Sequence, residues 1–367
     1  MIRLRSVARA TTVALAALAG LGVSEAVAFN TSTCLGEKVR WPSITVTMRA
    51  SPISFPAGAW RNALNETIGR WNLNPSRFRF DLRIESGVRL GNGQNEIWFS
   101  SDPAYSPAVA FTWVTCLDFF FFEIVRIDEA DVIFHNGVAY TPSTNKADLW
   151  PYSGPRRPFQ TTATHELGHA LGLGHVNTEY NVMGQDWTHI HANWNTARAY
   201  PGEDASDGAV HLYGTRSPRR EDVGVVHWKH SGASGEYSTH NRTRLYSIFG
   251  TPLPSVIDAG EPRFHVNREQ RIQTEFSYEN NGASFQSGIR VGYYISTNSL
   301  ITTFDRRIGG ATFQLARDNV FTKRISVTIP GDLSPGDYWL GVIIDETDAI
   351  NEVHEWNNAT YTAIRVN

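Results

Sequence analysis

The sequence predicts two parts of different architecture, a mixed α+β domain followed by an all-β, immunoglobulin-like sandwich. The chain has 367 residues, of which 41% are hydrophobic, and this is enough to fill two cores. Three helices are expected before residue 215, and no helical period of apolar residues persists beyond residue 222. We therefore expect a first domain at 29–214, a linker at 215–222 and a sandwich at 223–367.

The first 28 residues, 1–28, have the features of an export signal. Arginines precede the apolar run Thr11–Val23, and Ala26-Val27-Ala28 provides a small-residue cleavage site. We expect cleavage after Ala28 and a secreted protein, with the periplasm and the cell surface as open alternatives. The apolar run is too short for a membrane anchor, since a spanning helix needs about 20 apolar residues. No later segment predicts a membrane span.

The net charge and the cysteine content indicate which partners and which crosslinks to expect. The net charge is −3 and no block of Lys or Arg follows the signal, so nucleic acid is not an expected partner. The two cysteines, Cys34 and Cys116, are predicted to form a disulfide, because a lone pair in an exported chain is usually oxidised. The alternative is that Cys34 blocks a metal site as an inhibitory ligand.

Three helices and five strands are predicted in the first domain. Apolar residues spaced by three or four predict a helix over Trp60–Trp71, and Gly202–Gly214 has similar character. Another helix is expected to begin near Thr161 or Thr162, where a hydroxyl can cap free amides, after a loop over Asn136–Gln160. The strands are expected at Val39–Met48, Phe78–Ile84, Glu96–Phe99, Ala108–Val114 and Ala130–Phe134.

Beyond the linker Thr215–Asp222, strand-like runs alternate with turn sequences such as Asn280-Asn281-Gly282. This spacing predicts an all-β sandwich. The strands are expected at Val223–Trp228, Phe264–Val266, Arg271–Tyr278, Ile289–Ile295, Val320–Ile329, Tyr338–Ile344 and Thr360–Val366.

Two further features receive structural interpretations. The run Phe119–Phe122 is expected to be a strand or hairpin buried on both faces, with an apolar substrate pocket or a sticky loop as alternatives. Six histidines show no ligand spacing to a carboxylate or cysteine and are expected to be surface or hydrogen-bonded residues: His189, His191, His211, His227, His230 and His240.

The segment HELGHALGLGH, which begins at His165, carries the chemistry. His165 and His169 are four residues apart, so on a helix both imidazoles project from one face and can bind one ion. Gly172 falls where the helix must stop, because a residue without Cβ takes a positive φ at little cost, and the reversal returns His175 to the ion. Three imidazoles leave one tetrahedral position for water, as in catalytic zinc sites. Glu166 can lie beside the ion without binding it.

This pattern resembles the signature of the metzincin metalloproteases, and its residues look most like those of the matrixin branch. The resemblance implies a metzincin catalytic domain with a mixed twisted sheet and about three helices. It also implies one catalytic zinc ion, bound by His165, His169 and His175. Glu166 would then be the general base and acid in the hydrolysis of peptide bonds.

The resemblance covers about Lys38–Gly214 and extends to two weaker patterns. Metzincins place a methionine on a turn beneath the metal, and Met183 in the sequence Asn-Val-Met-Gly supplies one. Glu129–Phe134 resembles the family's edge strand above the cleft. The resemblance implies that a protein or peptide substrate lies antiparallel to that strand, as an added strand.

The end of the chain, roughly Asp258–Asn367, is similar to the adhesion-type (CARDB-like) immunoglobulin-like modules of bacterial secreted enzymes. The runs GDYWLGVIID and NEVHEWNN carry this similarity. It implies a surface, polymer or protein ligand and no chemistry of its own. Asp345, Glu352 and Glu355 could bind calcium, but we favour the interpretation that they fix the turns before the last strand.

Two functions are therefore compared. The first is a secreted zinc endopeptidase with a β-sandwich accessory domain. The second is a secreted binding or adhesion protein whose protease-like domain is inert. The intact Glu166 favours the first, because an inert descendant could lose this carboxylate freely.

Overall fold

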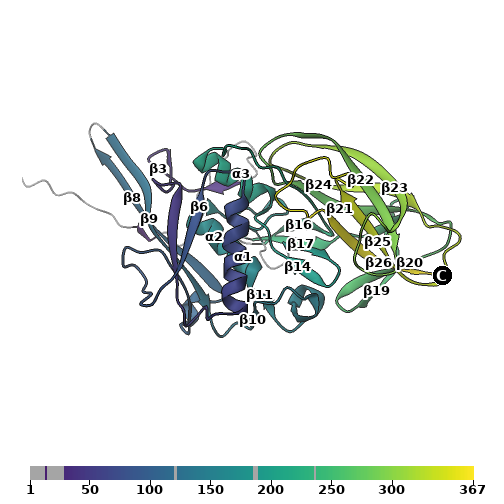
Figure 1. The fold of residues 1–367 in the computed structure, drawn as a ribbon, viewed down its shortest axis with the longest axis horizontal. Coiled ribbons are helices and arrows are strands. Elements are labelled where there is room, and N and C mark those ends of the chain that lie inside the picture. The colour runs from purple at the N-terminus through teal and green to yellow at the C-terminus, as the bar shows by residue number, and fades with distance from the viewer. Residues whose placement is uncertain (1–12, 15–28, 120–121, 185–188, 235–236) are drawn as a thin grey trace, which may run out of the picture.

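The computed structural model describes residues 13–14, 29–119, 122–184, 189–234 and 237–367. The predicted signal peptide lies outside the described residues except for two of its positions. The described chain is mixed α+β and mostly sheet, with the helices in one part and a β-sandwich in the other (Figure 1). Among the described residues, no helix is both long and apolar enough to cross a membrane.

The first part is built on a six-stranded mixed sheet in the order β1-β8-β9-β7-β5-β6. The strands β6, β5, β7 and β9 run parallel to one another, whereas β8 pairs antiparallel with β9 through a hairpin. The predicted strands are present with shifted ends. The bounds are β1 Val13–Ala14, β5 Thr45–Ala50, β6 Arg79–Ile84, β7 Glu96–Ser100, β8 Ala108–Phe119 and β9 Phe122–His135.

The prediction that Glu129–Phe134 forms the edge of this sheet is wrong. This segment belongs to β9, which lies between β7 and β8 and is buried throughout Glu129–Phe134. Burial on both faces is typical of an inner strand. The outer position belongs to β8. Among the described residues, the two residues of β1 are the only ones that pair with its outer side, and they do so antiparallel.

Two helices pack together in this part. The helix α1 (Ala59–Leu73) buries a stripe that includes Leu64, Ile68 and Trp71, as its spacing predicts. The indole nitrogen of Trp71 donates a hydrogen bond of 3.0 Å to the carbonyl of Thr164 in α2 (Phe159–Leu171), and this joins the two helices.

The start of α2 differs from the prediction of a hydroxyl cap. The helix begins at Phe159 and no side chain caps it. Pro158 occupies the capping position with a φ of −66°, which its ring fixes in advance, so Thr161 and Thr162 lie inside the first turn. The third helix, α3 (Gly202–Tyr213), has the bounds that the sequence indicates within one residue.

The loop expected over residues 136–160 contains short regular elements. Two 3₁₀ turns, Lys146–Asp148 and Trp150–Tyr152, lie between β10 and β11. The remaining short strands of this part are β2 Asn30–Thr31, β3 Thr33–Cys34, β4 Glu37–Lys38, β10 Tyr140–Thr141, β11 Arg157–Pro158, β12 Leu173–Gly174, β13 His191–Asn193 and β14 Thr196–Arg198.

The hairpin of β8 and β9 extends beyond the rest of the sheet (Figure 1). The phenylalanine run lies at its tip, and the exposure of two of its residues differs from the prediction. Phe119 is 41% exposed and Phe122 is 58% exposed, and the two rings stack with centroids 4.7 Å apart. The expectation of burial on both faces is therefore wrong for these two residues, because no element in the described part of the chain covers their side chains. Phe120 and Phe121 lie outside the described residues.

The predicted disulfide between Cys34 and Cys116 is confirmed. It ties the hairpin of β3 and β4 to the edge strand β8. Since Cys34 is oxidised, the alternative in which its thiol blocks a metal site does not describe this structure.

Replacing both cysteines by serine is expected to lower the free energy of unfolding by about 4 kcal/mol, because the crosslink closes a loop with a sequence separation of 82. Urea unfolding of the variant and of the wild type measures this difference. The reduced wild type is the control and should unfold at the same urea concentration as the variant. Equal midpoints for the oxidised wild type and the variant would contradict the prediction.

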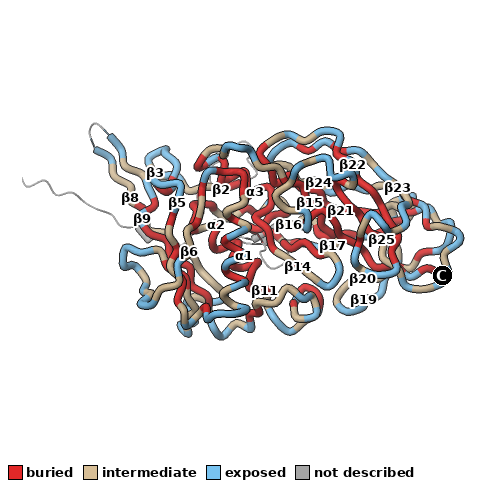
Figure 2. Tube along the Cα trace, viewed as in Figure 1, coloured by how far each residue is buried: buried red, intermediate tan, exposed pale blue. Residues whose placement is uncertain are grey.

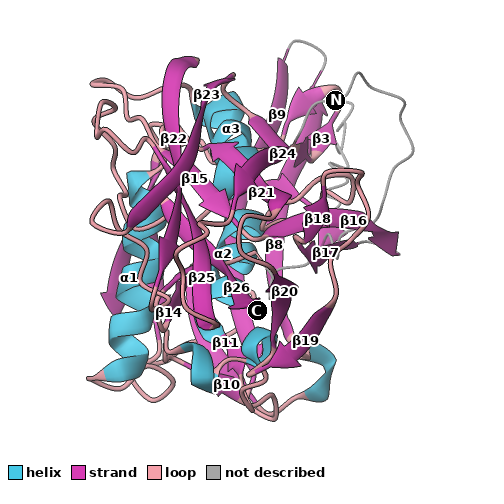
Figure 3. Cartoon of the chain, turned by 90° about the vertical axis from the view of Figure 1, so that its right-hand side faces the viewer, coloured by secondary structure: helices cyan, strands magenta, loops and turns pink. Residues whose placement is uncertain are grey.

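The second part is a sandwich of two sheets with a shared apolar core. In one sheet β21 pairs with β15, β18 and β24, and the other sheet has the order β19-β20-β26-β25-β22-β23. Phe276, Val291 and Leu340 come from the two sheets and are fully buried between them. In Figure 3 this sandwich faces the viewer and the helices lie behind it.

All the strands predicted for the sandwich are present, and the sequence missed β16 beyond its first residue, together with β17, β18, β19 and β23. The bounds are β15 Val223–Val226, β16 Trp228–Ser234, β17 Tyr237–Arg242, β18 Leu245–Ser247, β19 Ser255–Asp258, β20 Glu261–Val266, β21 Arg271–Asn280, β22 Gln286–Ser296, β23 Arg306–Leu315, β24 Asn319–Thr328, β25 Gly336–Ile344 and β26 Ala359–Val366.

The segment expected as a linker is packed against both parts. Arg220 donates a hydrogen bond to the carbonyl of Asn72 in α1, at 2.6 Å. The buried carboxylate of Asp222 accepts hydrogen bonds from the side-chain amides of Asn281 and Asn357 in the sandwich. Burial raises the pKa of Asp222 to about 7, although these N–H donors oppose the rise. Buried chain continues across the junction around α3 and β15 (Figure 2), so the two parts share an interface.

Candidate metal centre

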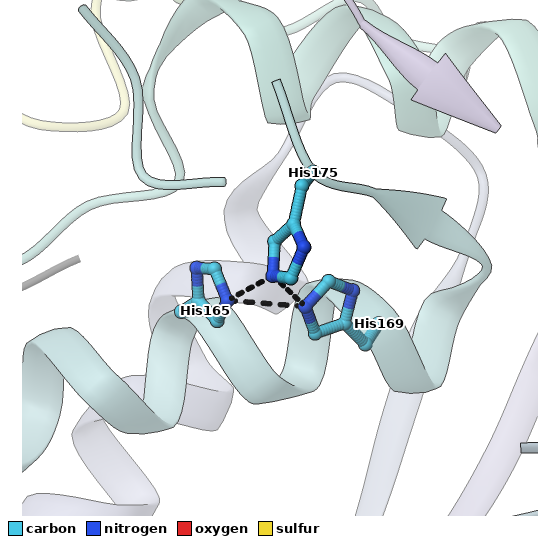
Figure 4. A group of neighbouring side chains, drawn as sticks. All are labelled: His165, His169 and His175. Atoms are coloured by element: carbon cyan, nitrogen blue, oxygen red, sulfur yellow. Dashed lines mark hydrogen bonds between the residues drawn. The ribbon is translucent and has the colours of Figure 1, made fainter. Parts of the chain in front are cut away.

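The helix α2 and the turn after it bring His165, His169 and His175 together. Both His165 and His169 lie on α2, which ends at Leu171. Gly172 follows with a φ of 113°, and its N–H donates to the carbonyl of His169 at 2.9 Å. The chain then reverses into β12, so that His175 returns to the face of the helix that bears the other two rings (Figure 4).

The three Nε2 atoms converge on one point. They are 3.0 Å apart between His165 and His169, 3.0 Å between His169 and His175, and 3.2 Å between His165 and His175. Zinc–nitrogen bonds of about 2.0–2.1 Å place tetrahedral ligands about 3.3–3.4 Å apart. The spacing of the three nitrogens is therefore close to that of ligands around a single zinc ion.

The contacts of Nδ1 in two of the histidines show which ring nitrogen carries a proton. His165 Nδ1 lies 2.7 Å from the carbonyl oxygen of Val182, and His169 Nδ1 lies 2.8 Å from that of Leu173. A carbonyl oxygen only accepts hydrogen bonds, so Nδ1 of each of these two rings carries a proton, and in the neutral form of the ring Nε2 is the nitrogen that can bind a metal. Three imidazole nitrogens at this spacing can act together as ligands of one cation. The donor set thus fits a zinc ion.

Met183 lies directly beneath the helix. Its side chain is fully buried, and a Cβ at Gly168 of α2 would collide with its sulfur. The preceding residue, Val182, supplies the carbonyl that orients His165. The methionine turn that the sequence indicates is therefore part of the support of the histidine group.

Glu166 follows His165 in α2 and is only 6% exposed. The adjacent positions on the helix place it in the same turn as the first histidine, as the sequence predicts. A carboxylate that is held next to a metal and away from bulk water can exchange a proton with a bound substrate or water molecule.

Two histidines differ from the prediction of surface or hydrogen-bonded residues. His189 and His191 are buried, and neither ring forms a hydrogen bond with any residue that the structure describes. His227, by contrast, is hydrogen-bonded to Thr360 and Arg242, as expected. Local spacing could not have identified His189, because the carboxylates near it lie on α3 and on β21 of the sandwich.

The carboxylates considered for calcium form hydrogen bonds around the turn before β26. Asp345 accepts a bond from the amide of Ile350, and Glu352 accepts one from the amide of Val223. Glu355 and Glu352 both accept from the side chain of Asn358. These contacts agree with the interpretation that the acidic residues fix the turn.

Comparisons with known proteins leave the family open. No protein-family model and no curated protein matches the chain. The crystal structure of a CARDB domain from Pyrococcus furiosus, in complex with di-metal ions, is 18% identical, covers 28% of this chain and 79% of that chain, and has a TM-score of 0.23. The C-terminal domain of wzt is 14% identical over 41% of this chain and 80% of that chain, with a TM-score of 0.21. Similarities at these TM-scores carry no argument about fold or function.

Proposed function

We propose that the protein is a secreted zinc-dependent endopeptidase of the matrixin-like metzincin type. The observation that carries the proposal is the convergence of three imidazole Nε2 atoms, which lie 3.0–3.2 Å from one another, with the buried Glu166 beside them. The mixed sheet with three helices, the αL turn at Gly172 and the buried Met183 support it.

In this proposal His165, His169 and His175 hold the zinc ion. When bound, zinc polarises the scissile carbonyl and lowers the pKa of water towards about 7. Glu166 accepts a proton from the attacking water and later delivers it to the departing amine. The carbonyls of Val182 and Leu173 keep two of the imidazoles in the ligand tautomer throughout, because each holds the proton on Nδ1.

The substrate peptide is expected to run antiparallel to β8, the outer strand of the sheet. The strand β1 pairs with Trp113 and Val114 of β8 in this orientation, so the outer side of β8 has backbone groups available for an added strand. Main-chain hydrogen bonds would then hold an extended peptide with little dependence on its sequence. The sandwich is assigned a binding role, towards a surface, a polymer or another protein.

Proteolysis that depends on zinc tests the proposed function. The purified exported chain is expected to cleave casein, and 1,10-phenanthroline is expected to stop cleavage because it removes zinc from the histidine group. Activity should return when zinc chloride is added in excess of the chelator. A zinc-loaded, folded protein that binds casein without cleaving it would contradict the proposal and favour an inert binding protein.

A further inference from the structure

A second group of ionisable side chains lies between the two parts of the molecule. It consists of His189, which precedes β13, Glu203 in the first turn of α3, and Glu279 in β21 of the sandwich. One nitrogen or oxygen atom from each of the three residues lies within 4.8 Å of those from the other two. His189 Nε2 is 3.7 Å from Glu279 Oε1, and both side chains have no exposed surface.

These groups are buried without compensation. Among the described residues, neither carboxylate and neither nitrogen of His189 has a hydrogen-bond partner, and no Lys or Arg forms an ion pair with Glu203 or Glu279. A buried polar group without a partner destabilises the fold, and an unpaired buried charge destabilises it more. A fold is expected to place such groups together only where something else satisfies them.

Burial also shifts the pKa values of the three groups in directions that a bound cation would exploit. It raises the pKa of Glu279 to about 8, with a further rise from the charge of Asp222, and it raises the pKa of Glu203 well above its usual range, with a further rise from the charge of Glu279. Burial lowers the pKa of His189 well below its usual range, so its imidazole is neutral at pH 7. A neutral imidazole is a metal ligand, and a divalent cation would stabilise both carboxylates in their ionised form.

The residues around His189 and Glu279 allow these two side chains to approach each other. Gly202 has a φ of 78°, and a Cβ there would lie 2.8 Å from His189 Cε1 and 3.7 Å from Glu279 Oε2. The absence of a side chain at this position therefore lets the imidazole and the carboxylate approach. The ring of Tyr180 packs against His189 with centroids 4.4 Å apart and fixes the plane of the imidazole.

We propose that His189, Glu203 and Glu279 form a second metal site, which binds a divalent transition-metal ion of the zinc class and has a structural role. The imidazole favours zinc over calcium or magnesium, which prefer oxygen ligands alone. Zinc ligands at about 2.0–2.2 Å from the ion lie about 3.3–3.6 Å apart, close to the 3.7 Å between His189 and Glu279. Complete burial leaves no path for a substrate, so the site is structural and not catalytic.

Such an ion would join the first part to the sandwich. Glu279 belongs to the sandwich, whereas His189 and Glu203 belong to the first part. Direct hydrogen bonds already cross this junction nearby, from Thr360 Oγ1 to the carbonyl of Ala192 and from the amide of Ile301 to Asn193 Oδ1. The metal would add a stronger link at the buried centre of the same interface.

Zinc content tests this proposal independently of the proposed peptidase function. The full exported chain, saturated with zinc chloride and then freed of loosely bound metal, is expected to contain two zinc ions. Glu279→Gln and His189→Gln should each contain one and should unfold at a lower temperature than the wild type. His169→Gln should also contain one, and the double variant His169→Gln/Glu279→Gln should contain none.

Glu275→Gln is the matched control, because Glu275 is buried on the same strand but is paired with Lys229 and Arg324. It should retain both zinc ions whatever its stability. If the variants at Glu279 and His189 do not fold, X-ray absorption at the zinc edge of the His169→Gln protein tests the proposal instead. The spectrum is expected to show zinc bound by one imidazole and by oxygen ligands. A zinc-free His169→Gln protein, two zinc ions in folded Glu279→Gln, or calcium in place of zinc would overturn the proposal.

Discussion

Replacing Glu166 by Gln is expected to reduce casein cleavage by about 10²- to 10⁴-fold while leaving the zinc content of the protein unchanged. General acid–base catalysis typically contributes a factor of this size, and an amide cannot accept the proton of the attacking water. Glutamine has nearly the same shape as glutamate, so α2 and the three histidine ligands should keep their positions. Initial rates of casein cleavage and the zinc-to-protein ratio measure the two effects separately.

Glu85→Gln provides the control for this variant. Its side chain is partly exposed and pairs with Arg49 at the surface, so cleavage and zinc content should both match the wild type. Near-normal turnover by Glu166→Gln would refute the assignment of this carboxylate. Loss of zinc from the folded variant would show instead that Glu166 helps to bind the metal.

Replacing Gly172 by Val is expected to remove zinc from the first histidine group and to destabilise the fold. The φ of 113° is strained for a β-branched residue, and the new Cβ would lie 3.1 Å from the carbonyl oxygen of Val39 and 3.3 Å from Leu212. Strain and overpacking together should cost about 3 kcal/mol. Because the turn at this residue aims His175, relief of the strain should displace the third ligand.

The zinc-to-protein ratio and the thermal unfolding midpoint measure these effects. Gly250→Val is the matched control, since Gly250 also has a positive φ but a Cβ there meets nothing within 4 Å. It should lose some stability and keep its full zinc content. Full zinc occupancy in Gly172→Val would show that the turn tolerates another geometry and that the reversal does not depend on glycine.

The sequence alone could predict the first histidine group because its parts are local. His165, His169 and His175 lie within one helix and the turn after it, so helical spacing and one glycine determine their convergence. The same reasoning located α1, in which spaced apolar residues form the buried stripe, and it located α3 to within one residue although α3 is buried along nearly its whole length. The disulfide was predictable because the chain offers only one pairing.

Prediction from sequence patterns was less reliable for the order of the strands in the sheet, because the order decides which strand lies at the edge. Glu129–Phe134 was assigned to the sheet edge, yet continuous burial of this segment signals an inner strand, and β8 takes the outer position. The phenylalanine run was expected to be buried, but hydrophobicity does not reveal that the hairpin tip extends past the elements that could cover it.

The sequence by itself determined the histidine group on one helix and the turn after it. It also determined the division of the chain into a helical part and a sandwich. Only the tertiary structure decided how those parts meet. It brought Glu279 of β21 to His189 and Glu203, and it held the segment before Asp222 against both parts. The physical reason is that local spacing fixes which side chains share a face, whereas contacts between distant strands and helices depend on how whole elements pack.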